Sequence, residues 1–253
     1  MNLLVNCSQN VIVQSLTRED LEMPTIVFAS SKGGAGKSTS AVLLATELAE
    51  RDATVTVIDA DPNRPLSKWA KHPGKPETLT VLNDVSEDTI IGTIEKAAGE
   101  AAFVIVDLEG TASLMVGLAM SRADLVIIPT QGSQLDATEA AKAVRLVKNQ
   151  EKALRLKIPM AILFTKTSAA IRPRTLAAIE AEFRKARVHV FDTQIHEREA
   201  YRAMFSFGRT LSGLDPSQVS NLATASANAK AFMAEVVHFL KTAAPEEPAA
   251  EVA

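Results

Sequence analysis

Residues 30–40, SSKGGAGKSTS, bring three glycines and two lysines together directly after the apolar run at residues 25–29. A glycine-rich turn between a strand and a helix offers several backbone N–H groups to one phosphate chain, and the helix dipole favours the same negative charge. Gly36, Lys37 and Ser38 fit the end of the P-loop pattern, although Ser31 stands where that pattern has its first glycine. The run fits instead the variant K-G-G-x-G-K-[ST], in which Lys32 precedes the glycines. A simple glycine turn would need neither lysine, so we interpret the stretch as a phosphate-binding loop.

Three aspartates follow the next predicted strands. Asp59 and Asp61 come after one apolar run, and alternation along an extended chain predicts that both point toward the phosphate loop. Asp107 ends the run at residues 103–106, which is the apolar-run-plus-acid form of the Walker B motif. Mg²⁺ keeps most of its waters and is held through one or two carboxylates, a loop hydroxyl and the phosphates. Each acid alone would also suit a turn or a strand end, but the order of Lys37, Asp61 and Asp107 favours one shared nucleotide site.

Short apolar runs alternate with helical periods along the chain, which predicts parallel strands joined by crossover helices. The runs are mostly continuous, as expected for strands that are covered on both faces. The predicted strands are residues 25–29, 54–58, 79–82, 102–106, 125–128, 160–164 and 188–191. The clearest predicted helices are residues 38–51, 87–98, 136–150, 174–186 and about 216–241. We therefore expect an α/β fold with an open, mostly parallel, twisted sheet and helices on both faces.

Composition limits the class of protein. The chain has 253 residues, of which 47% are hydrophobic and 23% are charged, as is typical of a soluble globular protein with a sizeable core. It has no run of about 18 apolar residues and no secretory signal pattern, so we expect a cytoplasmic protein without a membrane span. The single cysteine, Cys7, rules out an internal disulfide. We expect an N-terminal extension at residues 1–22, one nucleotide-binding domain at residues 23–242 and a disordered acidic tail at residues 243–253.

Four stretches together carry a family resemblance: SKGGAGKST, VIDADPNRP, FVIVDLEG and VFDTQIHEREAYRAMFSFGRTL. They resemble the ParA/MinD group of deviant Walker A ATPases, and within it the small ParA-like proteins of plasmid partition and conjugative DNA transfer. The similarity extends from about residue 24 to about residue 240 and implies the P-loop NTPase fold, with ATP and Mg²⁺ as cofactors. Two positions depart from the family: Leu108 stands where proline is frequent, and Thr165 lies near the place of an asparagine that meets adenine.

The resemblance also implies a role for each site residue. The lysine that matches Lys32 reaches across a dimer interface to the nucleotide of the other subunit, which makes an Mg·ATP sandwich homodimer. Lys37 would hold the β and γ phosphates, and Asp61 would orient the attacking water. Mg²⁺ would be held by Ser38, Asp59 and Asp107. The implied nucleotide-binding set is Lys32, Gly33, Gly34, Ala35, Gly36, Lys37, Ser38, Thr39 and Thr165.

The function implied by the family is an ATP-driven switch. It would hydrolyse ATP slowly, bind double-stranded DNA without sequence preference, associate with the nucleoid and act in plasmid partition or conjugative DNA transfer. A centromere-binding or relaxosome-type protein would be its partner. Two alternatives remain open: a ParA-like ATPase that positions a protein cargo, and a MinD-like ATPase that cycles on a membrane. The second needs a basic amphipathic terminal helix, whereas this chain ends AAPEEPAAEVA, so we expect no membrane binding.

Charge counting suggests where DNA would bind. Residues 166–209 contain nine Lys or Arg against five Asp or Glu, in a chain whose net charge is −3. Phosphate contacts of this kind carry no sequence information and weaken with salt. Each residue taken singly would fit a salt-bridged surface equally well, but as a set we predict DNA contacts by Arg172, Arg174, Arg184, Lys185, Arg187, Arg198 and Arg202. Lys142, Arg145 and Lys148 recur every three residues, and we interpret them as a solvated helix face.

Overall fold

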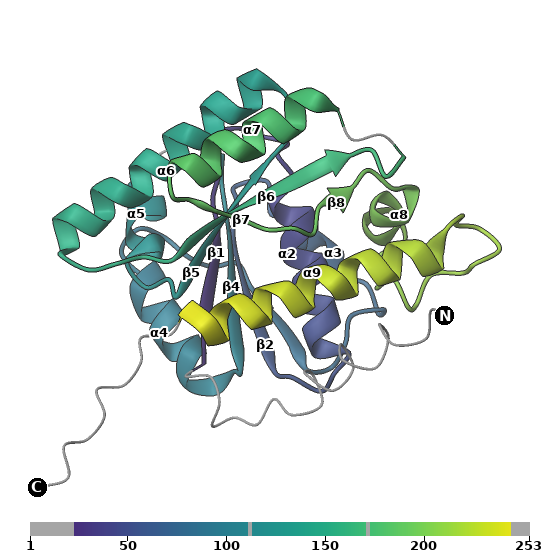
Figure 1. Ribbon diagram of the computed structural model, residues 1–253. Coiled ribbons are helices and arrows are strands. Elements are labelled where there is room, and N and C mark those ends of the chain that lie inside the picture. Colours follow the sequence, from purple (N-terminus) through teal and green to yellow (C-terminus); the bar gives the residue numbers. More distant parts are fainter. Residues whose placement is uncertain (1–22, 111–112, 171–172, 244–253) are drawn as a thin grey trace, which may run out of the picture.

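A computed structural model describes residues 23–110, 113–170 and 173–243. Its parallel sheet has the strand order β3-β2-β4-β1-β5-β6-β7, and β8 pairs with β6 beyond this path (Figure 1). The strands are β1 (Thr25–Phe28), β2 (Val55–Ala60), β3 (Leu79–Leu82), β4 (Phe103–Leu108), β5 (Leu125–Thr130), β6 (Met160–Thr167), β7 (His189–Val190) and β8 (Ile195–His196). The sheet confirms the predicted α/β fold.

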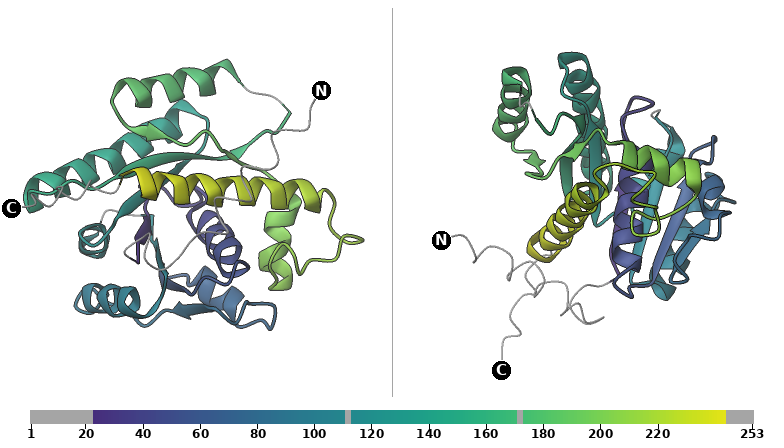
Figure 2. Two further views of the ribbon diagram at one scale, coloured as in Figure 1. Left: turned by 60° about the horizontal axis from the view of Figure 1, so that its bottom comes forward. Right: turned by 90° about the vertical axis from the view of Figure 1, so that its right-hand side faces the viewer.

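Helices cover both faces of this sheet. They are α2 (Lys37–Ala49), α3 (Pro65–Ala70), α4 (Ile90–Glu100), α5 (Leu114–Met120), α6 (Gln134–Leu154), α7 (Arg174–Lys185), α8 (Glu199–Phe207) and α9 (Leu222–Ala243). One hydrophobic cluster joins α2, α3, α8 and α9 to one face, and a second joins α4, α5, α6 and α7 to the other. The right-hand view of Figure 2 shows the same division, with α6 and α7 together and apart from α2 and α9.

Alternation within the strands produces the two clusters. In β1, Ile26 and Phe28 face the α2 side, whereas Val27 faces the α4 side. All three are fully buried. Side chains on both faces of a parallel strand need cover, which explains why the strands read as unbroken apolar runs.

The element boundaries differ from the sequence prediction in a few places. Helices α3, α5 and α8 and strand β8 were not predicted, because each is shorter than the span over which a period can be recognised. Helix α9 begins at Leu222, about six residues later than predicted, directly after Asn221, whose φ of 55° is left-handed. It ends at Ala243, so this first residue of the predicted tail is helical. The predicted extension at residues 1–22 and the remaining tail lie outside the described residues.

The strand order decides which strand ends meet. Strand β4 lies between β1 and β2, so the carboxyl ends of all three strands are neighbours. In the register, Asp107 of β4 pairs with Phe28 of β1 on one side and with Asp59 of β2 on the other. The glycine-rich loop follows β1 directly. The topology therefore gathers at one sheet edge the residues that the sequence places in three separate motifs. Among the described helices, none is both long and apolar enough to cross a membrane.

Candidate nucleotide site

The glycine-rich loop connects β1 to α2 and borders a cavity of about 460 Å³. Gly34 and Gly36 have φ angles of 76° and 96°, and Gly36 is the residue that precedes the first turn of α2. Backbone N–H groups at this helix start are available to an anion. The cavity is lined by Gly33, Gly34, Gly36, Lys37, Ser38, Thr39, Asp61, Pro62, Asn63, Glu109, Gly110 and Lys166. Most of the predicted phosphate-binding residues thus line one cavity, while Ala35 is buried behind them.

Lys37 supplies a buried cation beneath this loop. Its Nζ donates a hydrogen bond to Ser30 Oγ at 3.2 Å, and that hydroxyl donates in turn to the carbonyl of Lys32 at 2.8 Å. Burial lowers the pKa of Lys37, and the nearby carboxylates, Asp107 first among them, oppose this shift. A phosphate would supply the negative charge that a buried ammonium group favours.

Asp59 and Asp107 are buried neighbours at the ends of β2 and β4. Asp59 Oδ2 accepts two hydrogen bonds of 2.7 Å from Ser67, through the backbone N–H and Oγ. Its Oδ1, and both carboxylate oxygens of Asp107, have no hydrogen-bond partner among the described residues. Burial raises the pKa of both groups, that of Asp107 to about 7, although the nearby Ser38 hydroxyl opposes the shift of Asp107 and the Asp61 backbone N–H opposes that of Asp59. Buried carboxylates without partners are costly, so this pair suits a site that a cation completes.

The donor set fits Mg²⁺ rather than a metal held by protein side chains alone. Within the described residues, no group of three or more His, Cys, Asp or Glu side chains could hold a metal ion. Two carboxylates and the hydroxyl of Ser38 are instead the partial oxygen set that Mg²⁺ takes when phosphates and waters complete its shell.

Asp61 and Asp59 have different environments, although the sequence pattern predicts that they point the same way. Asp59 is buried against Ser67, whereas Asp61 lies in the loop after β2 and lines the phosphate cavity. The Oδ1 of Asp61 accepts a hydrogen bond from the Asn63 backbone N–H at 2.8 Å. Asp61 can therefore contact a molecule in the cavity, whereas Asp59 is buried and does not line the cavity.

Lys32 is not among the residues that line the cavity of its own chain. Its side chain is 49% exposed, and its Nζ forms an ion pair of 2.7 Å with Asp136 Oδ1 in the first turn of α6. Two further bonds join the loop to this helix start: Ser31 Oγ to the Glu139 carbonyl at 3.1 Å, and Gln131 Nε2 to the Gly34 carbonyl at 3.2 Å. The start of α6 thus supports the outer side of the loop.

Sequence reasoning missed several residues of the site. A Cβ on Gly110 would lie 2.8 Å from Gly33 N and 2.9 Å from Lys32 C, so the loop requires glycine there. Gly110 and Glu109 follow Asp107 in the quoted motif, and this closeness in sequence could have pointed to them. Asp136 and Lys166 carried no such signal, because α6 and β6 reach the loop only through the fold.

A second cavity of about 380 Å³ adjoins the loop beside Thr39 and Ser40 and extends to α8. Thr165 borders it but is almost fully buried, and its Oγ1 donates to the carbonyls of Ala35 at 2.6 Å and Thr130 at 3.2 Å. Its hydroxyl therefore supports the loop. The remaining wall comes from Lys166 and from α8 and the segment before it, namely Ile195, His196, Glu197, Arg198, Tyr201, Arg202, Phe205 and Ser206.

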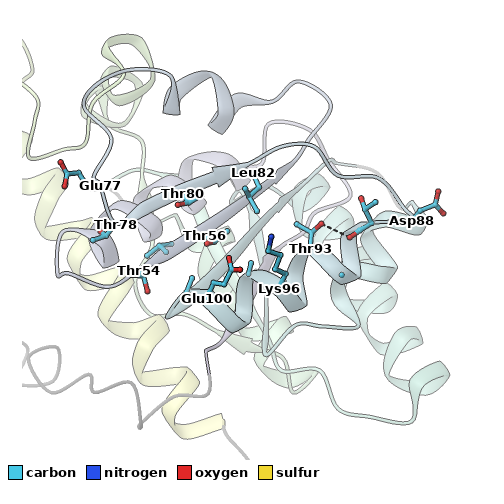
Figure 3. A pocket seen from close by; sticks show the side chains of 15 residues that line it. Thr54, Thr56, Glu77, Thr78, Thr80, Leu82, Asp88, Thr93, Lys96 and Glu100 are labelled. Carbon is cyan, nitrogen blue, oxygen red and sulfur yellow. Dashed lines mark hydrogen bonds between the residues drawn. The ribbon is translucent and has the colours of Figure 1, made fainter.

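A cavity of about 770 Å³ lies elsewhere, between α4 and the strands β2 and β3. Figure 3 shows the side chains of Thr54, Thr56, Thr78 and Thr80 on the strand side of this cavity and those of Lys96 and Glu100 on the side of α4. Its β2 residues belong to the amino end of that strand, whereas the site carboxylates follow its carboxyl end. It is therefore separate from the phosphate site.

The described residues among those predicted to bind DNA lie on or beside α7 and α8. Arg184 at the end of α7 pairs with Asp192 at 2.8 Å, and Arg202 on α8 pairs with Glu197 and Glu199 at 2.9 Å each. Arg198 borders the 380 Å³ cavity instead. Arg174, Lys185 and Arg187 are exposed on or beside α7, and Arg172 lies outside the described residues.

Comparison with known proteins agrees with this geometry. The family model of the VirC1 protein matches residues 23–244. The ParA protein of Rhizobium radiobacter is 47% identical over 210 residues, which cover 83% of this chain and 94% of that protein. The virC1 protein of Rhizobium rhizogenes is 29% identical over 187 residues, 72% of this chain and 80% of that protein.

Solved structures share the fold at lower identity. The ATP complex of a McdA variant from Cyanothece has a TM-score of 0.71 at 17% identity and covers 86% of this chain and 97% of that one. The MinD cell division protein of Aquifex aeolicus has a TM-score of 0.65 at 19% identity, over 85% of this chain and 98% of that one. The phosphate loop, the strand order and these matches agree: the chain belongs to the VirC1 family, within the ParA/MinD class of P-loop ATPases.

Proposed function

We propose that this chain is an ATP-dependent dimerising switch that binds Mg·ATP, hydrolyses it slowly and acts in plasmid partition or conjugative DNA transfer. The observation that carries the proposal is the meeting of a glycine loop, the buried Lys37 and two incompletely paired carboxylates at one sheet edge. The VirC1 and ParA relatives support the biological setting. A centromere-binding or relaxosome-type protein would stimulate hydrolysis, and non-specific DNA binding would place the dimer on the nucleoid.

The side chains divide the work by position. Lys37 neutralises the β and γ phosphates, while Thr39 contacts the α phosphate and the loop N–H groups from Gly33 to Gly36 line the chain. Ser38, Asp59 and Asp107 would hold Mg²⁺, which when bound screens the phosphates from the carboxylates. Asp61 orients the attacking water from the cavity wall. Thr165 holds the loop through the Ala35 carbonyl, so its part in nucleotide binding is indirect.

Lys32 supports the dimer part of the proposal. Two nucleotides that face one another repel, and a cation from each side relieves this repulsion. Lys32 lies on the outer side of its loop and outside its own cavity, where a second subunit could approach it. Leu135 and Leu114, at the starts of α6 and α5, are 79% and 62% exposed. These side chains would lose contact with water if a second subunit covered the starts of both helices.

A second candidate function is the positioning of a protein cargo. It is favoured by a relative called maintenance of carboxysome distribution protein A, from Gloeobacter kilaueensis. The nucleotide site would work in the same way in both functions. A MinD-like membrane cycle gains no comparable support from the described residues.

The first prediction concerns assembly. Wild type should be monomeric with ADP and dimeric with a slowly hydrolysed ATP analogue, as measured by light scattering at micromolar concentration. Lys32→Ala should bind the analogue but stay monomeric, because the cation that crosses the interface is lost, and Lys37→Ala should lose nucleotide binding. Lys230→Ala, an exposed lysine of α9, is the control and should dimerise. A wild type that stays monomeric with the analogue contradicts the sandwich model.

The second prediction concerns hydrolysis. Asp61→Ala should bind Mg·ATP and dimerise, yet its kcat should fall at least about tenfold with little change in KM, because a group that orients water acts mainly in the transition state. Asp84→Ala, an exposed aspartate away from the cavity, should behave as wild type. Equal turnover by the Asp61 variant and wild type would remove Asp61 from the mechanism.

The third prediction concerns pH. Burial raises the pKa of Asp107 to about 7, whereas an aspartate in the unfolded chain titrates near about 4. Between these values the folded state binds more protons, so the nucleotide-free protein should lose stability relative to Asp107→Asn as pH rises from 5 to 8. Melting temperatures of both proteins across this range test it, with Asp84→Asn as the control. Curves that stay parallel for Asp107→Asn and wild type would show that Asp107 does not titrate there.

A further inference from the structure

Helix α6 carries a row of basic side chains that the nucleotide site does not use. The helix has 21 residues, and its buried stripe includes Ala137, Ala140 and Val147, which pack in the second hydrophobic cluster. Outside this stripe, basic residues continue through the helix and just beyond its end. We name them the α6 ridge: Lys142, Arg145, Lys148, Lys152, Arg155 and Lys157, all of which are exposed.

The α6 ridge is largely unneutralised. Within residues 142–157 the only acid is Glu151, whose carboxylate accepts a hydrogen bond from the Ile158 N–H at 3.1 Å and lies 3.9 Å from Lys157. Lys142 pairs with Glu139, one turn earlier, at 2.6 Å. The side chains of the other four members, Arg145, Lys148, Lys152 and Arg155, form no ion pair or hydrogen bond with any described residue.

This arrangement differs from the surface that charge counting selected. There, Arg184 and Arg202 are already paired with acids of the chain. From Lys142 to Arg155, like charges follow one another at spacings of three or four residues, and like charges at such spacings destabilise a helix. An anionic polymer would relieve this repulsion. From Lys142 to Arg155 the helix rises about 20 Å, which matches about six base-pair steps of a duplex.

The packing of α6 makes a lipid surface a poorer partner for the α6 ridge than DNA. A membrane-bound amphipathic helix inserts an apolar face, but the apolar stripe of α6 is already buried against the sheet. The large apolar residues exposed on or beside α6 are Leu135 at its start, 79% exposed, and Leu154 and Leu156 at its far end, each 42% exposed, so they form no continuous apolar face. In Figures 1 and 2, α6 lies beside α7 at the periphery of the molecule, where a rigid duplex could approach it.

We propose that the α6 ridge is the surface by which this chain contacts the phosphates of duplex DNA. This inference rests on the DNA binding in the proposed function and locates it. The start of α6 is tied to the phosphate loop through the Lys32–Asp136 ion pair and the Ser31–Glu139 hydrogen bond. One helix therefore connects the nucleotide to the DNA surface, which gives DNA affinity a route to depend on ATP.

The test compares two triple charge reversals in the full chain. Arg145→Glu/Lys148→Glu/Lys152→Glu changes the α6 ridge, and Arg184→Glu/Lys185→Glu/Arg187→Glu changes the end of α7 by the same charge. Binding to unrelated DNA duplexes is titrated with an ATP analogue and with ADP at several salt concentrations, after dimerisation has been confirmed. The ridge variant should lose at least about tenfold in affinity and have a shallower salt dependence, by about 0.9 per lost phosphate contact. The α7 variant should stay within about threefold of wild type.

Each other outcome has a definite meaning. Wild type that binds no duplex with the ATP analogue overturns the DNA part of the proposed function itself. Wild type that binds, together with an unaffected ridge variant, overturns the inference alone. A triple Gln variant at the same three positions is used if the Glu variant fails to fold or dimerise, and it must also lose affinity. Binding to phosphatidylglycerol vesicles that depends on the ridge, with DNA binding unchanged, would assign the ridge to lipid instead.

Discussion

The site depends on one constraint: Asp59 and Asp107 are buried side by side with fewer partners than their oxygens need. Ser67 satisfies one oxygen of Asp59, and the other three oxygens have no partner among the described residues. Such a pair needs either a bound proton or a positive charge close by, and Lys37 supplies part of that charge from the end of the loop. A cation bound with a phosphate would supply the remainder. The buried pair of Asp59 and Asp107 thus favours the binding of a cation together with a phosphate.

The strand order creates this constraint and places the loop above it. Because β4 lies between β1 and β2, the glycine loop after β1 and the acids after β2 and β4 share one edge. The loop leads into helix α2, which packs against α9 and the sheet. On the outer side of the loop, Lys32 forms an ion pair with Asp136 of α6. The loop is therefore fixed from both sides, and Lys32 is kept at the outer surface, where a second subunit could meet it.

The local sequence pattern was enough to predict most of the strands, the glycine loop and the place of Asp107 at a strand end, because each depends on residues that are adjacent in sequence. The partners of these residues could not be predicted in this way. The Lys32–Asp136 pair joins residues 104 positions apart, and the pairing of Arg184 and Arg202 with acids depends on how α7, α8 and their loops fold. Lys142, Arg145 and Lys148 were visible as a period of three, but only the fold shows which ridge side chains have an acidic neighbour, as Lys142 and Lys157 do. Short elements such as α3 and α8 gave too little pattern to detect.

The most direct test of the central claim is a calorimetric titration of wild type and Asp107→Asn with ATP, in the presence and absence of Mg²⁺. The substitution keeps the shape of the side chain and removes its charge. We predict that Mg²⁺ tightens ATP binding to wild type by at least about tenfold, and that this effect is largely lost in the variant because one of the two carboxylates near the cation is neutral. Equal dependence on Mg²⁺ in both proteins would contradict the account, since the buried carboxylates would then have no part in completing the nucleotide site.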